Sequence, residues 1–93
     1  MLHQRIKELR QAGGWNQVDL AKKLNVTKQT ISNWENDNIQ PSIEMLMRLS
    51  KIFNVSTDYL LGLDDRTLLD VTGLSRETIG HLSLLISDFQ KNA

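Results

Sequence analysis

Apolar residues recur at helical spacing in almost every segment of the chain, and this spacing limits the fold more than any other feature. The first segment shows it clearly, with apolar residues three or four positions apart: Leu2, Ile6, Leu9 and Ala12. Such spacing places side chains on one face of a helix, whereas a half-buried strand would alternate apolar and polar residues. No segment alternates in this way, and we find no internal repeat. The sequence therefore predicts an all-α protein.

Residues that end or begin helices separate these apolar segments. Gly13 and Gly14 follow the first segment, and glycine accepts the left-handed geometry found just past a helix end. Asn25 is predicted to form a left-handed turn, and Pro41 closes a loop. Side chains suited to cap a helix N-terminus precede the next four helices: Asn16, Thr27, Ser42 and Ser56. We therefore predict five short helices in residues 1–62.

The predicted buried faces of these helices follow from the same spacing. The second helix is expected to bury Val18, Ala21 and Leu24, and the third Ile31 and Trp34. The fourth carries its apolar residues at helical spacing: Ile43, Leu46, Leu49, Ile52 and Phe53. We expect these faces to meet in one small core.

The composition changes after Gly62. Residues 63–73 are predicted to form an acidic connector, and residues 74–91 a final amphipathic helix capped by Ser75. One apolar stripe runs along this helix: Ile79, Leu82, Leu85, Ile86 and Phe89. Such a stripe must be buried against something. We predict that it is a dimerisation element, and the alternative is that the helix packs on its own domain.

Composition and charge exclude several classes of function. The chain has no cysteine, so it can form neither a disulfide nor a thiolate metal site. Residues 1–62 carry eight Lys or Arg and six Asp or Glu, whereas residues 63–93 carry three and five. A nucleic-acid contact is therefore expected in the first part of the chain. There is no catalytic grouping, phosphate-binding glycine loop, signal peptide or long apolar run, so we expect a cytoplasmic protein that is not an enzyme and needs no cofactor or metal.

The third predicted helix has an unusual solvent face. Residues 25–36 read NVTKQTISNWEN, and short amide and hydroxyl side chains fill the positions where strong helix formers would be expected. The second and third helices have the layout of a helix-turn-helix, whose second helix enters the DNA major groove. Five side chains are therefore predicted to face the bases: Lys28, Gln29, Thr30, Ser32 and Asn33. The alternative is an ordinary polar surface.

Two stretches then make the interpretation more specific: QVDLAKKLNVTKQTISNWENDNIQPS at residues 17–42 and NVSTDYLLG at residues 54–62. They resemble the phage repressor/Cro family of helix-turn-helix regulators, also called the XRE family. The resemblance implies an ion pair between Arg10 and Glu35. Together with the predicted helix starts, it implies these phosphate-binding residues: Asn16, Gln17, Thr27, Asn36 and Asn38. Asn25 replaces the family's usual glycine, and the loop before Pro41 lacks the basic cluster of some relatives.

The resemblance implies a transcriptional regulator that binds double-stranded DNA. One recognition helix, here residues 28–36, reads only a few base pairs, so a single copy cannot compete with non-specific sites. We expect a repressor that binds a palindromic operator as a homodimer. The alternative is an antitoxin-like or partner-controlled module, in which the acidic C-terminal third binds a small protein antagonist or a toxin and DNA binding is autoregulatory.

Overall fold

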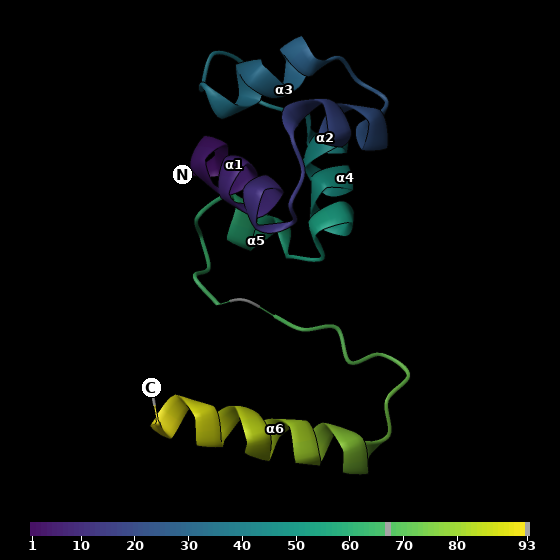
Figure 1. The fold of residues 1–93 in the computed structure, drawn as a ribbon, viewed down its shortest axis with the longest axis vertical. Helices are drawn as coiled ribbons and strands as arrows, with labels where there is room; N and C mark the ends of the chain where they lie inside the picture. Colours follow the sequence, from purple (N-terminus) through teal and green to yellow (C-terminus); the bar gives the residue numbers. More distant parts are fainter. Residues whose placement is uncertain (67, 93) are drawn as a thin grey trace.

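The computed structural model describes residues 1–66 and 68–92. It contains α1 (Leu2–Ala12), α2 (Gln17–Leu24), α3 (Lys28–Glu35), α4 (Ile43–Phe53), α5 (Thr57–Leu60) and α6 (Arg76–Lys91). The first five helices form one body, and α6 lies apart from it at the end of an extended connector (Figure 1). The described residues contain no strand. The prediction of an all-α fold is confirmed.

Each predicted helix start is stabilised by the side chain that the sequence singled out. Asn16 Oδ1 accepts a hydrogen bond from the backbone N–H of Asp19 at 2.7 Å, and Asp19 Oδ2 accepts one from the N–H of Asn16 at 3.0 Å. This reciprocal pair satisfies two N–H groups that a helix N-terminus leaves without partners. Four other residues accept the N-cap bond in the same manner: Thr27, Ser42, Ser56 and Ser75. The helix boundaries are therefore encoded locally.

A single core holds the body together. Its buried members come from all five helices: Ile6, Leu20, Ala21, Leu24, Ile31, Trp34, Leu49 and Leu60. Trp34 and Ile31 place the inner face of α3 on this core, against α1 and α2. Trp15 packs at its edge, where its ring stacks on Phe53 with 5.9 Å between the ring centroids. The core therefore fixes the inner face of α3 and leaves its outer face free.

Two predicted core positions are wrong. Val18 is 40% exposed, and Ile43 is 79% exposed. Val18 lies one turn before the exposed Lys22 and shares its side of α2, while Leu20 is the residue that the core buries. Ile43 lies one turn before Met47, which is also exposed, on the side of α4 that faces away from the body. In both helices the other residues of the predicted face pack on the core, and Val18 and Ile43 lie in the first turn, at the edge of that face.

The last helix buries no residue. On its stripe Leu85, Ile86 and Phe89 are 52%, 42% and 69% exposed, and Ile79 and Leu82 are half-buried. None of the helices in the described residues is long and apolar enough to cross a bilayer.

Candidate nucleic-acid interface

α2 and α3 are joined by a tight turn. Asn25 adopts the left-handed conformation, with φ 56° and ψ 45°, and ends α2. The backbone N–H of Val26 donates to the carbonyl oxygen of Ala21 at 2.9 Å, and Thr27 caps α3. Asparagine is among the few non-glycine residues that adopt left-handed geometry readily, so it supports this turn without a glycine. The expected helix-turn-helix is present.

α3, the predicted recognition helix, has two chemically different faces. Ile31, Trp34 and Glu35 are buried on the inner face. Lys28 and Gln29 are exposed, and Thr30, Ser32 and Asn33 are half-buried. Figure 1 shows α3 at the outer edge of the body, at the end opposite α6. The five residues predicted to read bases therefore belong to the helix whose outer side is open to a duplex.

Hydrogen bonds between these side chains orient them. Gln29 Nε2 donates to Asn33 Oδ1 at 3.0 Å, one turn further along α3. The hydroxyl oxygens of Thr27 and Thr30 lie 2.9 Å apart. Gln29 keeps its carbonyl oxygen and one N–H, and Asn33 keeps both N–H groups, so the pair still offers donors and an acceptor to a base edge. The sequence predicted the two residues but not this link.

A buried charge network lies behind α3. The guanidinium of Arg10 donates to Glu35 through Nε at 2.7 Å and through Nη2 at 2.9 Å. Its Nη1 donates to the carbonyl oxygen of Trp15 at 2.8 Å. The hydrogen bond to Glu35 raises the pKa of Arg10. The ion pair that the resemblance implied is therefore present and ties α1 to α3.

Gln17 joins this network. Its Nε2 donates to Glu35 Oε1 at 3.2 Å, so Glu35 accepts hydrogen bonds from both α1 and α2. Gln17 is half-buried at the first position of α2, and its amide retains a second N–H. The resemblance implied a phosphate contact for Gln17, and its bond to Glu35 links this residue to α3 as well.

The other predicted phosphate-binding residues are all exposed: Asn16, Thr27, Asn36 and Asn38. Asn16 and Thr27 stand at the N-termini of α2 and α3, and Asn36 follows the end of α3. The backbone N–H of Asn38 donates to the carbonyl oxygen of Asn33 at 2.9 Å, which folds the loop back onto α3. The structure therefore places these residues at the two ends of α3 and at the start of α2.

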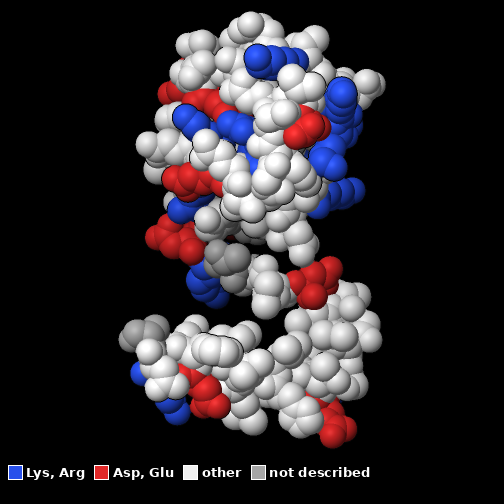
Figure 2. Space-filling view, viewed as in Figure 1, with Lys and Arg blue, Asp and Glu red and all other residues white. Residues whose placement is uncertain are grey.

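The positive charge near this surface comes from lysines. Arg10 is neutralised by Glu35, whereas Lys22, Lys23 and Lys28 belong to α2 and α3 and are exposed. Lys23 Nζ lies 4.5 Å from the centre of the Trp15 ring. Figure 2 shows more Lys and Arg side chains over the body than around α6. The charge asymmetry in the sequence is thus an asymmetry between the two ends of the molecule.

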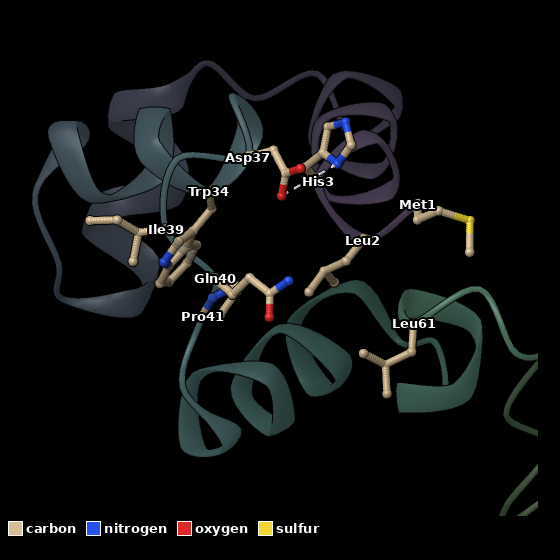
Figure 3. A pocket seen from close by; sticks show the side chains of 9 residues that line it. All are labelled: Met1, Leu2, His3, Trp34, Asp37, Ile39, Gln40, Pro41 and Leu61. Atoms are coloured by element: carbon tan, nitrogen blue, oxygen red, sulfur yellow. Dashed lines mark ion pairs between the residues drawn. The ribbon is translucent and has the colours of Figure 1, made fainter.

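A cavity of about 300 Å³ lies between the N-terminus of α1, the loop after α3 and the end of α5 (Figure 3). His3 and Asp37 face each other there, with 3.9 Å between Nδ1 and Oδ1. None of the predicted DNA-binding residues lines this cavity. The described residues contain no cluster of side chains suited to hold a metal ion.

Comparisons with known proteins identify the family. Residues 6–60 match the helix-turn-helix family. The HTH-type transcriptional regulator ImmR of Bacillus subtilis (strain 168) is 44% identical over 78 residues, which cover 84% of this chain and 61% of that protein. Two further curated relatives from the same organism are covered over 58% and 56% of their lengths. The chain thus spans less than two thirds of these relatives.

Solved structures show the same fold. The P22 c2 repressor in complex with a synthetic operator has a TM-score of 0.65 and 36% identity, over 69% of this chain and 97% of that chain. A complex of the SinR and SinI proteins has a TM-score of 0.63 and 28% identity, over 100% of both chains. The chain therefore belongs to the helix-turn-helix family, in its phage-repressor type, which comprises DNA-binding transcriptional regulators and not enzymes.

Proposed function

We propose that this protein is a sequence-specific repressor that binds a palindromic operator as a homodimer, with residues 28–36 in the major groove. The observation that carries the proposal is the polar outer face of α3, fixed from behind by Ile31, Trp34 and the buried Glu35. The P22 c2 repressor, which shares the fold, was solved with a synthetic operator. A rigid helix with short polar arms suits recognition of base edges. Such a repressor acts in the cytoplasm on chromosomal or phage DNA.

The residues proposed to contact bases differ in the hydrogen-bonding groups that they offer. Lys28 suits the acceptors of guanine, and the amides of Gln29 and Asn33 suit adenine. Thr30 and Ser32 are half-buried and lie beside them, where a hydroxyl or a methyl group can meet the groove edge. Each good contact contributes about 1–3 kcal/mol of discrimination between bases.

The phosphate-binding residues have a different role. We assign it to Asn16, Gln17, Thr27, Asn36 and Asn38, which lie at helix ends and in the loop after α3. Side-chain amides, hydroxyls and backbone N–H groups at helix N-termini suit phosphate oxygens. These contacts fix the register of α3 on the duplex and carry no sequence information themselves.

The homodimer is proposed from α6. A helix of 16 residues that buries none of them is marginally stable in water, because forming its first turn is costly. Its stripe, with Phe89 69% exposed, becomes stable when a second copy covers it. Pairing through α6 brings two recognition helices onto half-sites about 34 Å apart. The stripe that forms the dimer contact consists of Ile79, Leu82, Leu85, Ile86 and Phe89.

A second candidate function is control by a small protein partner. The complex of SinR with SinI supports it, because the similarity to this chain extends over its whole length. In this case a small protein antagonist or a toxin binds the acidic C-terminal third, and DNA binding is autoregulatory. The two functions differ in what occupies α6: a second copy, or another protein.

Selection of binding sites from a random duplex pool at about 0.15 M salt tests the main proposal, because non-specific binding is weakened there. We expect a two-fold symmetric motif. Gln29→Ala should relax the preference at one base position, Gln17→Ala should weaken binding to all sequences, and the exposed Gln11→Ala on α1 serves as the control. A single unsymmetric half-site would contradict the homodimer. No enrichment at all would contradict the operator-binding function and favour the protein partner.

A further inference from the structure

Arg5, on α1, holds the chain where it leaves α5. Its Nη1 donates to the carbonyl oxygens of Tyr59 and, at 3.0 Å, of Asp64. Its Nη2 donates to Asp65 Oδ1 at 2.7 Å. The guanidinium carbon lies 4.2 Å from the centre of the Tyr59 ring. One side chain of the body thus contacts the end of α5 and the first residues of the connector.

The hydrogen bonds from Arg5 to backbone carbonyl oxygens stabilise this arrangement more than its ion pair does. The Asp65 side chain is 92% exposed, so its ion pair with Arg5 contributes little. The Arg5 side chain is only 19% exposed, and its bonds to two carbonyl oxygens hold the backbone itself. A planar guanidinium can lie flat on a ring while N–H groups on separate nitrogens donate in its plane, whereas an ammonium group donates from a single atom and has no flat face to stack.

Local backbone geometry and hydrogen bonds place the first residues of the connector next to Arg5. Gly62 has a φ of 79°, which turns the chain after α5, and the N–H of Leu63 donates to the carbonyl oxygen of Asp58 at 2.9 Å. Asp64 Oδ1 accepts a hydrogen bond from the N–H of Arg66 at 2.9 Å, and the side chain of Arg66 also donates to this carboxylate. These bonds lower the pKa of Asp64. The chain is therefore folded back on itself where Arg5 holds it.

We propose that Arg5 is a positioning residue that makes residues 63–65 part of the DNA-binding body, and that it thereby limits the spacing of operator half-sites. The inference rests on the proposed homodimer. Residues 66–75 of the sequence then connect this held segment to α6. A chain of this length reaches at most about 33–36 Å, and release of residues 63–65 adds about 10 Å on each side of the dimer. A longer span tolerates more arrangements of the two half-sites.

NMR backbone relaxation of the full chain, without DNA, tests whether Arg5 holds residues 63–65 on the body. The steady-state heteronuclear ¹⁵N NOE of residues 63–65 should equal that of α5 and should fall clearly in Arg5→Ala. Arg5→Lys keeps the charge and most of the stem but lacks the planar fork, so it should behave like Arg5→Ala. Asp65→Asn is the matched control, because it weakens only the exposed ion pair and should leave the NOE high. Unchanged values in Arg5→Lys and Arg5→Ala would overturn the proposal.

Binding to duplexes with different half-site spacings tests whether Arg5 limits the spacing that the dimer accepts. The probes are duplexes with two copies of the selected half-site, moved apart by about one to four base pairs from the selected spacing. The affinity of the unchanged protein should fall about tenfold across this series, and that of Arg5→Lys no more than about threefold, because a longer tether flattens the dependence of effective concentration on distance. Affinity for a single half-site should be equal in both proteins, which separates positioning from general damage to the fold.

The outcomes are distinct. A lowered NOE with an unchanged spacing profile would overturn the positioning role and leave Arg5 as a structural contact only. Absence of a two-fold motif in the selection would defeat the proposed homodimer, and with it the limit on spacing. The heteronuclear NOE measurement then still decides whether residues 63–65 belong to the body.

Discussion

Arg10 and Glu35 join α1 to the end of α3 through two hydrogen bonds, with Nε 2.7 Å from Oε2 and Nη2 2.9 Å from Oε1. Both residues are buried, at 8% and 6% exposure. The same carboxylate accepts a hydrogen bond from Gln17, the first residue of α2. One buried anion therefore sets the mutual positions of three helices, including the one proposed to read DNA.

Removal of one member of this pair should destabilise the body strongly. Glu35→Leu leaves the Arg10 guanidinium buried without its anion, and we expect the free energy of unfolding in urea to fall by about 3–5 kcal/mol. The double variant Arg10→Met/Glu35→Leu should recover most of this loss. Glu8→Gln, on the exposed side of α1, should change stability by less than about 0.5 kcal/mol. A loss below about 1 kcal/mol in Glu35→Leu would show that the charge is not buried in solution.

Gln29 and Asn33 should act as one reading unit, because Gln29 Nε2 donates to Asn33 Oδ1. Each single change to alanine should reduce affinity for the selected operator by about 1–3 kcal/mol. The double variant should lose less than the sum, with a coupling of at least about 0.5 kcal/mol in a double-mutant cycle. Gln29→Ala combined with Lys22→Ala, on α2, should be additive. Additivity for Gln29 and Asn33 would contradict the link.

The turn at Asn25 should be sensitive to the shape of the side chain. Asn25→Val places a β-branched residue at a φ of 56°, and we expect a loss of about 1–2 kcal/mol in thermal unfolding. Asn25→Gly should change stability by less than about 0.5 kcal/mol, because glycine adopts this conformation freely. Asn54 has a φ of 54° at the end of α4 and should show the same ranking. Equal stability of the two Asn25 variants would contradict the left-handed turn.

Local signals explain why so much of the fold could be predicted. Asn16, Thr27, Ser42 and Ser75 each accept a hydrogen bond from the backbone N–H three residues further on, so each helix start is visible in the sequence around it. Asn25 is similar, since its conformation depends on its own side chain. The outer face of α3 could be found because its residue types are a poor choice for an idle helix surface.

The errors and omissions came from packing. Val18 and Ile43 were assigned to the core because they share the apolar spacing of their helices, but both lie in the first turn, where the core does not cover them. The bonds of Arg5 to Tyr59 and Asp65 join residues 54 and 60 positions apart, and no spacing rule connects them. The bond of Gln17 to Glu35 likewise exists only because α2 and α3 pack together.

The stripe on α6 should control the oligomeric state. Leu82→Glu/Ile86→Glu places two charges on the proposed contact, and we expect sedimentation equilibrium to show a monomer where the unchanged protein is a dimer. Leu84→Glu is the matched control: Leu84 is 68% exposed and lies outside the stripe, so this variant should remain dimeric. A dimeric double variant would show that the copies associate elsewhere.

The positions of the tryptophans allow unfolding of the body to be followed separately from unfolding of α6. Both lie in the body: Trp34 is buried behind α3, and Trp15 stacks on Phe53. Residues 63–93 contain none. Tryptophan fluorescence therefore follows melting of the body alone, whereas far-ultraviolet circular dichroism also records α6. A single heated sample, observed by both methods, shows whether the two ends of the chain unfold together or in turn.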